Sequence, residues 1–503
     1  MKQAIVLLIL IFLNAGNVSA SKYTGTKTLD DGTVYEGEFE NGEIRGMGKF
    51  TYTNGDIYEG ETRHEEKHGE GKMTWVDGAT YVGRFANGTL NGKGIYTSPN
   101  GETQEGEFID GKINGKGRFT YSKGEIYVGE IKHNRRNGQG AMTWPDGTYY
   151  EGNFKNDLMD GHGKLKHPSG ISYEGEFKDG IVHGKGKLTN PDGSIYDGEV
   201  KNGIMHGVGK LTYVNGDIFE GELKDGELYK GKTIKQNGTI LDGEYKNDIF
   251  TKGLIELTDG TRFEGEIKDG LLHGYGIMTK PNKTSYEGQY IDGLIQGIVK
   301  IKLISGAIYE GQIKDGKPHG NGTLTVGEGT IYVGEFQDGA MQGQGKLTHP
   351  DGETNEGEFK NGLLNGQVKV VYPDGEINEG EFIDDVMNGY GKVIFPDGVL
   401  NEGEFIDGEL NGQGKILYLD GEVHEGVYID GELNGQGKIT FSDGEIHEGG
   451  FVDGEMNGQG KIIFSDGEVH VGDFVNGELN GKGTVKYPDG ELIDVEFEDG
   501  EIQ

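Results

Sequence analysis

Two short segments of the sequence have residue types and spacings that could do chemistry. Residues 226–233, GELYKGKT, fit the pattern G-x-x-x-x-G-K-[ST], in which a glycine-rich loop and a lysine hold nucleotide phosphates. Residues 64–68, HEEKH, fit the pattern H-E-x-x-H, in which two histidines hold a catalytic zinc ion. Both chemistries depend on a helix, because the phosphate loop must open one and the two histidines must share one helical face.

The surroundings of both segments are set by a repeat. The segment YEGEF at Tyr35 returns in variant form as far as Ile493, which gives 21 unit starts. Eighteen of the twenty steps are 23 residues long, and the two steps on either side of Leu241 are 22 residues long. Glycine supplies 96 of the 503 residues, together with 25 tyrosines and 21 phenylalanines. This periodicity indicates an array of similar supersecondary units.

The unit at residues 173–195 shows what the repeated positions do. Tyr173, Gly175 and Phe177 alternate with glutamates, which predicts a strand with one aromatic-and-glycine face and one acidic face. The returning strand alternates as well and is expected to place Gly184 and Gly186 on one face.

Turns join the strands at fixed positions of the unit. Asp179-Gly180 predicts a tight hairpin turn, because glycine accepts the positive φ that such turns need. Asp192 and Gly193 then turn the chain into the next hairpin. We therefore expect an all-β fold, an elongated, twisted, single-layer antiparallel array of about 21 hairpins with no large globular core. Aromatic rings would lie across the hollows that the glycines leave.

Neither chemical motif fits this array. Residues 226–233 cover a turn and a returning strand whose flanks have no helical period, so a phosphate-binding loop is not expected. Residues 64–68 span a hairpin turn, which leaves a surface metal clip formed by His64 and His68 as the alternative to a protease.

His424, His447 and His470 share one column of the repeat, at steps of 23 residues. Successive imidazoles are expected two strands apart, at ~10 Å, so adjacent histidines are too far apart to bind one zinc ion. We expect an exposed edge column in which histidine replaces tyrosine. No catalytic residue and no cofactor site is predicted.

The first twenty residues have a different character. Lys2 precedes an apolar run at residues 4–13, and residues 18–20, Val-Ser-Ala, form a small-residue cleavage site. These features predict a secretory signal peptide at residues 1–20 and a protein that is secreted or lies in the secretory lumen. The alternative is attachment to the membrane through an uncleaved signal anchor. The chain has no cysteine and therefore no disulfide or zinc–thiolate site.

Charge divides the repeats into two regions. The formal net charge is −37, and residues 355–503 hold 34 acids against 8 lysines and arginines. Residues 21–354 are mildly acidic, whereas residues 355–503 are strongly acidic and carry Asn or His in the first-position column. An acidic chain repels nucleic acid and disfavours anionic phospholipid. Its acidic face is also a hypothetical site for weak, multivalent calcium binding.

One basic cluster is an exception to the acidic character of the chain. Lys132, Arg135 and Arg136 occupy the position of a hairpin turn and could contact a phosphate group. The plain interpretation of the cluster is a solvated loop.

The pattern YEGEF-x-[DN]G-xxx-GxG-xxxxx-DG resembles the MORN (membrane occupation and recognition nexus) repeat. Residues 173–177, Gly184, Gly186, Asp192 and Gly193 carry the match, which extends from Tyr23 to Gln503. The resemblance implies hairpin units in an elongated curved sheet. In the family these repeats are proposed to bind anionic phospholipid, to mediate self-association, or both.

The sequence thus predicts a non-enzymatic, secreted or lumenal repeat scaffold that binds proteins or associates with itself through the aromatic face. The alternative is a phospholipid-binding, in particular phosphoinositide-binding, module at a membrane surface. A third hypothesis, much less favoured by the residues, is an enzyme such as a phosphoinositide kinase or a nucleotide hydrolase.

Overall fold

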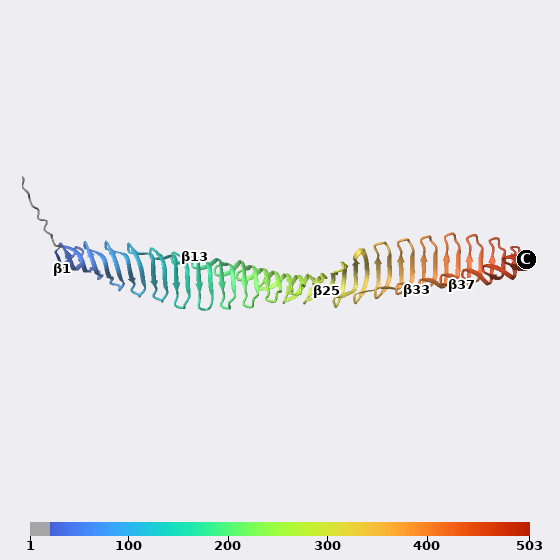
Figure 1. Ribbon diagram of the computed structural model, residues 1–503, viewed down its shortest axis with the longest axis horizontal. Coiled ribbons are helices and arrows are strands. Elements are labelled where there is room, and N and C mark those ends of the chain that lie inside the picture. The colour runs from blue at the N-terminus through green and yellow to red at the C-terminus, as the bar shows by residue number, and fades with distance from the viewer. Residues whose placement is uncertain (1–20) are drawn as a thin grey trace, which may run out of the picture. The chain divides into compact units, whose positions relative to one another are not determined.

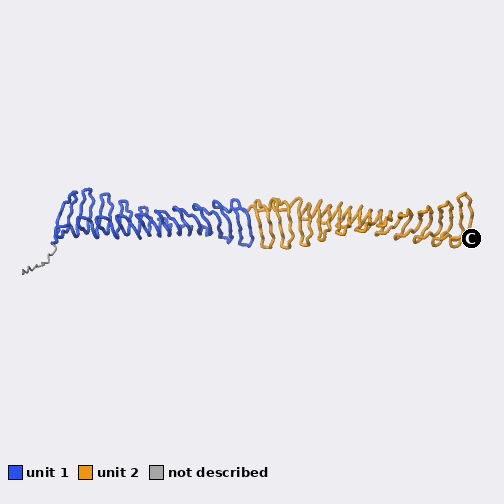
Figure 2. Tube along the Cα trace, turned by 90° about the horizontal axis from the view of Figure 1, so that it is seen from above, with its two compact units in different colours: residues 1–249 blue, residues 250–503 orange. Residues whose placement is uncertain are grey.

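The computed structural model describes residues 21–503, so the predicted signal peptide at residues 1–20 lies outside the described residues. The described residues divide into two compact units, residues 21–249 and 250–503 (Figure 2). Within each unit the strands form a single layer, and each strand pairs antiparallel with the next strand in sequence (Figure 1). The predicted all-β hairpin array is confirmed. The described residues contain no helix with the length and apolar character needed to cross a membrane.

The first unit contains twenty strands and the first residue of the next one. Its strands are β1 (Lys22–Thr28), β2 (Val34–Glu40), β3 (Glu43–Thr51), β4 (Ile57–Arg63), β5 (Glu66–Thr74), β6 (Thr80–Ala86), β7 (Thr89–Thr97), β8 (Thr103–Ile109), β9 (Lys112–Thr120), β10 (Ile126–Lys132), β11 (Arg135–Thr143), β12 (Tyr149–Lys155), β13 (Leu158–Lys166), β14 (Ser172–Lys178), β15 (Ile181–Thr189), β16 (Ile195–Lys201), β17 (Ile204–Thr212), β18 (Ile218–Lys224), β19 (Glu227–Ile234) and β20 (Ile240–Lys246).

The second unit contains the other strands and one short 3-10 helix, η1 (Gly327–Gly329), in a turn. Its strands are β21 (Ile249–Glu256), β22 (Arg262–Lys268), β23 (Leu271–Thr279), β24 (Ser285–Ile291), β25 (Leu294–Lys302), β26 (Ile308–Lys314), β27 (Lys317–Val326), β28 (Thr330–Gln337), β29 (Ala340–Thr348), β30 (Thr354–Lys360), β31 (Leu363–Val371), β32 (Ile377–Ile383), β33 (Val386–Ile394), β34 (Leu400–Ile406), β35 (Glu409–Leu417), β36 (Val423–Ile429), β37 (Glu432–Thr440), β38 (Ile446–Val452), β39 (Glu455–Ile463), β40 (Val469–Val475), β41 (Glu478–Lys486), β42 (Leu492–Glu498) and β43 (Glu501–Ile502).

Strands β14 and β15 show how one unit folds. Tyr173, Gly175 and Phe177 are buried on the aromatic face of β14, whereas the two glutamates between them are exposed on the opposite, polar face. Gly175 faces Gly186 of β15, and Tyr173 faces Leu188. We call the first strand of a unit the outgoing strand and the second the returning strand. Period-two alternation in the sequence therefore builds the two faces as predicted.

Two kinds of turn join these strands. Asp179 and Gly180 both have positive φ, 50° and 85°, as in the two-residue type I′ turn that matches the twist of a hairpin. The other turn begins at Asn190, whose carbonyl accepts the N–H of Gly193 at 2.9 Å. Pro191 follows at the position where its fixed φ suits a type I turn, and Gly193 closes the loop with a φ of 91°.

A bulge interrupts each regular hairpin. β14 pairs in register with β15 up to Gly175, and the register shifts before Phe177. Gly184 lies in the bulge with a φ of 68°, which favours glycine. A Cβ atom on Gly184 would meet the Glu176 carboxylate on the polar face. The structure therefore differs from the expectation that Gly184 and Gly186 share one face, because the bulge rotates the backbone at Gly184.

The core of the unit is a tyrosine ring lying on glycine. The ring of Tyr173 covers Gly186, where a Cβ atom would collide with it, and its hydroxyl donates to the carbonyl of Glu176 at 3.1 Å. Its ring centroid lies 5.3 Å from that of Phe177 in a perpendicular arrangement. The ring of Tyr150, one unit earlier, lies 4.9 Å from the same Phe177. Each phenylalanine thus joins two successive units.

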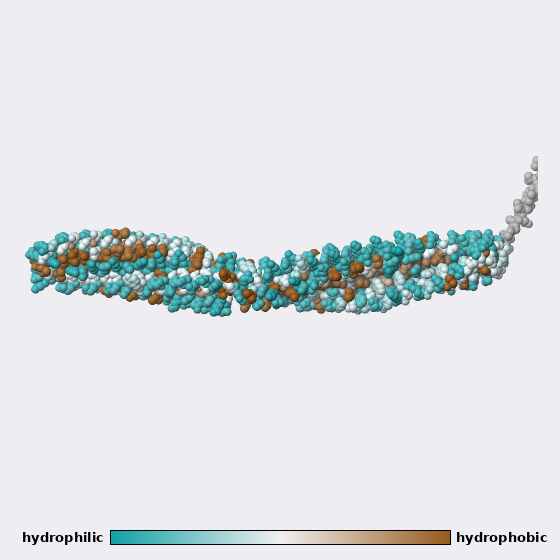
Figure 3. Space-filling model, turned by 180° about the vertical axis from the view of Figure 1, so that it is seen from behind, coloured by the Kyte–Doolittle hydropathy of each residue, from teal (hydrophilic) through white to brown (hydrophobic). Residues whose placement is uncertain are grey.

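This packing buries the aromatic column without a second layer of protein. Hydrophobic residues form a stripe along each unit, bordered by hydrophilic residues (Figure 3). The first-position tyrosines are at most 1% exposed at Tyr35, Tyr58, Tyr81, Tyr127, Tyr150, Tyr173 and Tyr196. The tyrosine rings of this column are therefore covered by neighbouring residues of the same sheet.

In the strongly acidic region, residues 355–503, other side chains fill the space that the tyrosine ring occupies over the glycines. Its asparagines cannot reach across the glycines, and the side-chain oxygens of Asn355, Asn378 and Asn401 are buried without a hydrogen-bond partner among the described residues. Leu410 lies instead over Gly414, the counterpart of Gly186 in its unit. An aliphatic side chain from the returning strand thus replaces the tyrosine ring.

The histidine column also lies in this core. His447 Nε2 is 2.6 Å from Glu445 Oε1, and its ring centroid is 4.7 Å from that of Phe441. His424 and His470 repeat the arrangement, and the three side chains are only 12–20% exposed. The predicted exposed edge column is therefore wrong. Histidine keeps the inward direction of the tyrosine that it replaces, since the strand register is unchanged.

The 22-residue step from Phe219 to Leu241 shortens the bulge rather than the pairing of the strands. In β18 and β19, Glu222 faces Lys230 and Leu223 faces Leu228, so one residue, Tyr229, remains unpaired. The division between the compact units falls in this shortened stretch, between residues 249 and 250. The change of charge at residue 355 lies inside the second unit.

Candidate functional site

The polar face carries a row of side chains that runs across the strands, with one residue from each strand. From β12 to β19 this row alternates between acids and bases, and we call it the outer ladder. Glu151 faces Lys164, Lys164 faces Glu174, and Glu174 faces Lys187. The Lys164 amino group lies 2.7 Å from the Glu174 carboxylate, and opposite charges on facing strands stabilise a sheet. The regular ladder is therefore a neutralised, hydrophilic surface.

The outer ladder is broken twice between β6 and β11. Val82 faces Ile95, and four strands further on Val128 faces Ala141. These aliphatic side chains remain on the polar face, where Val82, Ile95 and Val128 are 52%, 43% and 51% exposed. Two apolar contact points thus stand in this stretch of the polar face, where the two ladder residues between them, Glu105 and Arg118, are charged.

Glycine forms the floor between these contact points. The residues of the floor pair in succession across β6 to β11 and are Gly83, Gly94, Gly106, Gly117, Gly129 and Gly140. A Cβ atom on Gly83 would point to Tyr81 on the aromatic face, so the polar face of this row is bare backbone. The result is a groove of about 1360 Å³ that extends from β5 to β12.

Charged side chains line both walls of the groove. The acidic residues are Glu70, Glu105, Glu107, Glu130 and Glu151, and the basic residues are Lys93, Lys116 and Arg118. Glu105 faces Arg118 in the ladder, yet neither forms an ion pair within 4.0 Å among the described residues. The groove therefore combines two apolar points, a bare backbone floor and an acidic balance of charge. We refer to it as the ladder-break groove.

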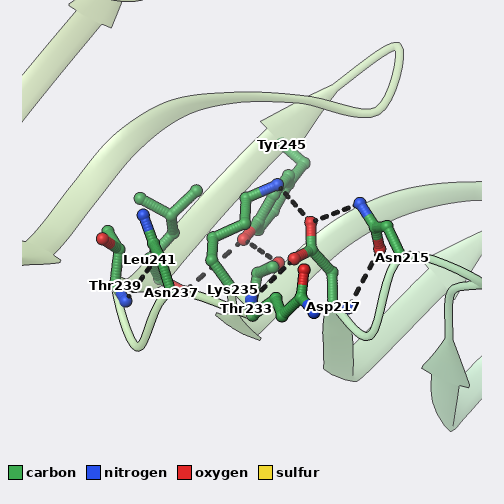
Figure 4. Close-up of polar contacts among 9 residues, drawn as sticks. Asn215, Asp217, Thr233, Lys235, Asn237, Thr239, Leu241 and Tyr245 are labelled. Atoms are coloured by element: carbon green, nitrogen blue, oxygen red, sulfur yellow. Dashed lines mark hydrogen bonds and ion pairs between the residues drawn. The ribbon is translucent and has the colours of Figure 1, made fainter.

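The phosphate-loop pattern at residues 226–233 does not form a phosphate cradle. Gly226 lies in a hairpin turn with a φ of 92°, and Lys232 lies on the outer ladder of β19. Thr233 points to the opposite, aromatic face, where its hydroxyl lies 2.6 Å from the hydroxyl of Tyr245 (Figure 4). Because neighbouring residues of a strand face opposite ways, the lysine and the threonine cannot share a ligand.

The polar residues beside this segment hold the turns together. Asp217 accepts hydrogen bonds from the Lys235 amino group at 2.9 Å and from the Gln236 N–H at 2.8 Å (Figure 4). Burial by itself raises the pKa of Asp217, but these hydrogen bonds outweigh it and hold the pKa below its ordinary value. The network joins one turn to the turn of the following unit.

The two histidines of residues 64–68 lie in different environments. His64 has a φ of 51° in a hairpin turn, and its Nδ1 lies 3.3 Å from Glu43. His68 lies in the bulge of β5, where its carbonyl accepts the Tyr58 hydroxyl at 3.0 Å. In residues 21–503 no group of three or more His, Asp or Glu side chains is placed to hold a metal ion.

The basic cluster is divided between the two faces. Lys132 faces Arg135 across the turn, and Arg135 is 63% exposed. Arg136 turns inward with 19% exposure, donates to the carbonyl of Asp157 at 2.6 Å and lies over the ring of Phe154. Only Lys132 and Arg135 present charge to solvent.

Sequence reasoning missed the ladder-break groove. Its signal is present in the second-position column, where Val82 and Val128 stand in place of the usual acid. Ile95 and Ala141 stand in the returning-strand column that carries lysine in most units. Whether these two columns face each other depends on the register of the paired strands. The bulge shifts that register, and the repeat length alone does not reveal the shift.

Comparison with known proteins supports the fold. The family model described as MORN repeat matches residues 35–57, 58–80, 81–103, 105–126, 127–149, 150–172, 173–195, 196–218, 263–285, 286–298, 309–330, 332–354, 356–377, 379–399, 402–423, 424–446, 447–469 and 470–491. Comparison with curated proteins gave no match.

Solved structures resemble only parts of the chain. The SAS-4 (dCPAP) TCP domain of Drosophila melanogaster, solved with a proline-rich motif of Ana2, is 16% identical over 31% of this chain and 85% of that domain, with a TM-score of 0.22. The TCP10 domain of Danio rerio CPAP is 16% identical over 45% of this chain and 96% of that domain, with a TM-score of 0.18. The MORN match covers most of the described residues, and its matched segments follow the 23-residue repeat, so the chain belongs to the MORN-repeat family.

Proposed function

We propose that this repeat scaffold binds a partner protein and that the ladder-break groove holds an extended segment of that partner. The observation that carries the proposal is the double interruption of the outer ladder at Val82–Ile95 and Val128–Ala141. Exposed aliphatic side chains lose contact with water when a partner covers them, which favours binding by ~25 cal/mol for each Å² of apolar surface. The regular ladder offers no such contact.

The spacing of the interruptions predicts the partner sequence. Val82 and Val128 lie on outgoing strands four strands apart, which corresponds to ~19 Å at ~4.8 Å for each strand. An extended chain rises ~3.3 Å for each residue, so two side chains that reach both points are about six residues apart. An even spacing also keeps both side chains on one face of the segment.

The charge of the groove selects what lies between these two side chains. The lining as a whole has five acids against three bases, and between the apolar points β8 contributes Glu105 and Glu107 while β9 contributes Lys116 and Arg118. We therefore propose a segment with lysine or arginine between two apolar residues, because complementary charge favours the correct partner and its register.

The test is selection of displayed random 12-residue peptides on the full chain, followed by binding measurements with the recovered peptides. The matched variant restores the ladder through Val82→Glu, Ile95→Lys, Val128→Glu and Ala141→Lys. We expect apolar residues at i and i+6 with basic residues between them, and at least about tenfold weaker binding to the variant, which corresponds to ~1.4 kcal/mol. Equal binding to both proteins contradicts the proposal.

A second variant controls for a general effect of charge. Glu174→Val with Lys187→Ile places one apolar pair in the regular ladder, outside the groove. We expect this variant to bind the selected peptides as the wild type does.

The phospholipid alternative has one supporting feature, the exposed Lys132 and Arg135. We nevertheless expect no binding to phosphatidylcholine vesicles with or without phosphatidylinositol bisphosphate, because the formal net charge of −37 repels anionic headgroups. Flotation only with the anionic vesicles, lost in Lys132→Ala/Arg135→Ala, would support the alternative.

We also propose that the scaffold acts after export. Support comes from Lys2, the apolar run at residues 4–13 and the small residues at 18–20. Amino-terminal sequencing of protein recovered from the medium of expressing cells should begin at Ser21. Protein retained in the cytosol with residues 1–20 intact contradicts this part of the proposal.

A further inference from the structure

We propose that a cavity beside Asn355 binds a guanidinium group, which either an arginine side chain of a partner or a small guanidinium compound supplies. The cavity lies on the aromatic face of the second unit, over β29 to β32. Three observations support the site: a buried oxygen without a donor, an acidic wall, and a matched place in the first unit that an arginine of the chain itself fills. The ladder-break groove lies on the other face and plays no part in it.

The cavity has a volume of about 290 Å³, enough for a group much larger than one water molecule. The rings of Phe359, Tyr372 and Phe382 form part of its wall, together with the aliphatic side chain of Leu364. No lysine or arginine of residues 21–503 lines it. Its aromatic walls therefore suit a cation that lies over the face of a ring.

Asn355 of β30 supplies the buried oxygen. Its side chain is 6% exposed, and its Nδ2 donates to Glu353 Oε1 at 3.1 Å. Because a carboxylate only accepts hydrogen bonds, this contact fixes which end of the amide is the nitrogen. The Oδ1 atom is buried and accepts no hydrogen bond from residues 21–503. A buried carbonyl without a donor is costly, so a ligand that brings N–H groups gains by satisfying it.

Two carboxylates border the cavity, those of Glu353, which immediately precedes β30, and Asp385, in the tight turn between β32 and β33. Asp385 Oδ1 accepts the N–H of Leu364 at 2.7 Å. Among residues 21–503 neither carboxylate has a basic side chain within 4.0 Å. His349 is the one base among the described residues of the lining. The wall is therefore acidic, which favours a cationic ligand.

Asp385 occupies a turn position that carries glycine in most units. Its φ of 72° lies in the left-handed region, which favours glycine. Asn378 and Asn401 also have an Oδ1 without a partner among the described residues, but the turn position that corresponds to Asp385 is glycine there. The buried oxygen and the aspartate thus occur together at Asn355.

An arginine of the chain itself fills the corresponding place in β10 to β12. Arg136 and Leu364 occupy the same position of the repeat, on β11 and β31. The backbone N–H of Arg136 donates to Asp157 Oδ1 at 2.8 Å, as the N–H of Leu364 donates to Asp385. The guanidinium of Arg136 in turn donates to the carbonyl of Asp157 at 2.6 Å. The aspartate is thus present at both places, whereas the arginine is present at one.

The rings around the Arg136 guanidinium mark where the cavity lies. The distances from its Cζ atom to the ring centroids are 5.8 Å for Tyr121, 6.0 Å for Tyr127 and 5.5 Å for Phe154. The residues at the same positions in the second unit all line the cavity. They are His349, Asn355 and Phe382. The cavity therefore occupies the place that the guanidinium occupies in the first unit.

A leucine in place of the arginine does not by itself explain the cavity. Leu228 and Asp248 stand at the same two positions of the repeat, and the Leu228 N–H donates to Asp248 Oδ1 at 2.8 Å. The ring at the first position is kept there, because Phe219 is fully buried. In β30, Asn355 replaces that ring as well. Two replacements thus open the cavity while the acid remains.

A guanidinium group matches these features better than an ammonium group does. It carries several N–H donors and no acceptor, so it can donate to Asn355 Oδ1 and to Asp385 at once. It also stacks on aromatic rings such as those of Phe382 and Tyr372, and it is more weakly hydrated than an ammonium group. The class of ligand is therefore a guanidinium cation.

The test is saturation-transfer difference NMR with the full chain, which detects weak binding of small molecules. The probes are ethylguanidinium and the capped tripeptide acetyl-Gly-Arg-Gly-amide. The same tripeptide with lysine is the control for charge alone, and the one with citrulline is the neutral control. About 0.15 M sodium chloride limits attraction to the rest of the acidic surface, because it screens exposed charges beyond ~8 Å.

We expect both guanidinium probes to bind, the lysine peptide to bind at least about tenfold more weakly than the arginine peptide, and the citrulline peptide not to bind. Tighter binding of the arginine peptide than of ethylguanidinium identifies a protein segment as the source of the group. Tighter binding of ethylguanidinium identifies a small compound.

Three variants locate the binding. Asp385→Gly introduces the residue that most units carry at this turn, so the hairpin is kept, and loss of the acid should weaken binding at least about tenfold. Asp248→Gly is the matched change beside a filled first position and should leave binding unchanged. Leu364→Arg supplies an internal guanidinium, as Arg136 does, and should abolish binding. Hydrogen–deuterium exchange in β30 to β33 reports whether each variant is folded.

The outcomes are distinct. Absence of binding of both guanidinium probes to the wild type overturns the proposal, as does binding of the lysine or citrulline peptide as tight as that of the arginine peptide. Wild-type affinity in folded Asp385→Gly also overturns it, and this comparison decides even if Leu364→Arg does not fold. The ladder-restored variant should bind every probe as the wild type does, whereas loss of binding in that variant would place the guanidinium in the groove instead.

Discussion

The two faces of the sheet obey different rules although the same strands build both. On the aromatic face, glycine occupies the third position in 20 of 21 units, and a change of the first residue is compensated by a neighbour such as Leu410. On the polar face, the breaks at Val82–Ile95 and Val128–Ala141 are not compensated, and Val82, Ile95 and Val128 stay exposed. The aromatic face therefore maintains the fold, and irregular positions on the polar face are the candidates for binding a partner.

The largest expected effect comes from removing a ring on the aromatic face. Tyr173→Asn deletes the group that fills the space over Gly186 and should cost about 3 kcal/mol of local stability, as other large-to-small core changes do. Hydrogen–deuterium exchange followed by mass spectrometry should show faster exchange in β14 and β15 and in the strands beside them.

The matched change in the acidic region is Asn401→Ala. Leu410 already covers Gly414 there, so we expect exchange in β34 and β35 to change little. If Tyr173→Asn and Asn401→Ala accelerate hydrogen exchange equally in their own regions, tyrosine-filled and leucine-filled units do not differ as described.

The second effect concerns the glycine beneath the ring. Gly186→Val pushes a side chain into the ring of Tyr173 and should cost about 2 kcal/mol, within the usual range for overpacking. The array contains a precedent, because Tyr286 is only half-buried in the unit that carries Val299 at this position. Local exchange in β14 and β15 measures the loss.

Gly391→Val is the control, since its unit has Asn378 in place of tyrosine and the nearest side chain is the flexible Met387. We expect a smaller acceleration there than at Gly186→Val. A loss of protection as large as that caused by Gly186→Val would show that the ring is not the reason for the glycine.

A third effect appears at alkaline pH. Burial raises the pKa of Tyr81, Tyr150, Tyr196 and Tyr332 to about 12, above the ordinary value of 10.0. Their contribution to stability is therefore complete below pH ~10 and is lost as the pH rises through ~12. A titration followed by absorbance of tyrosinate should show a late class of tyrosines whose ionisation coincides with loss of the β circular dichroism signal. Complete titration near pH 10 with the signal intact would contradict the burial of the column.

The smallest effect is expected on the polar face. Lys164→Ala removes an ion pair whose two side chains are 46% and 60% exposed, so stability should change very little. Exchange in β13 and β14 should match the wild type. A loss comparable to that of Tyr173→Asn would mean that the outer ladder, too, maintains the fold.

The repeated features could be predicted from sequence because they depend on neighbouring residues alone. Alternation placed Tyr173 and Phe177 on one face, and Asp179-Gly180 marked the tight turn. The inward direction of the histidines was not predicted, because the polarity of His447 suggested an exposed side chain. Its direction is set by the strand register, and Glu445 provides a polar partner there.

The groove could not be predicted without the register of successive strands. The bulge at Gly184 and its counterparts shifts the pairing, and only the shifted pairing sets Val82 against Ile95 and Val128 against Ala141.

The most direct test of the central claim is the exchange footprint of a bound peptide. A 12-residue peptide selected on the wild-type chain is added in excess, and backbone exchange is compared with and without it. Protection confined to β6 to β11, and absent in the ladder-restored variant, is the result we predict. Protection in β33 to β40 instead, or protection that survives ladder restoration, would show that the ladder-break groove is not the binding site.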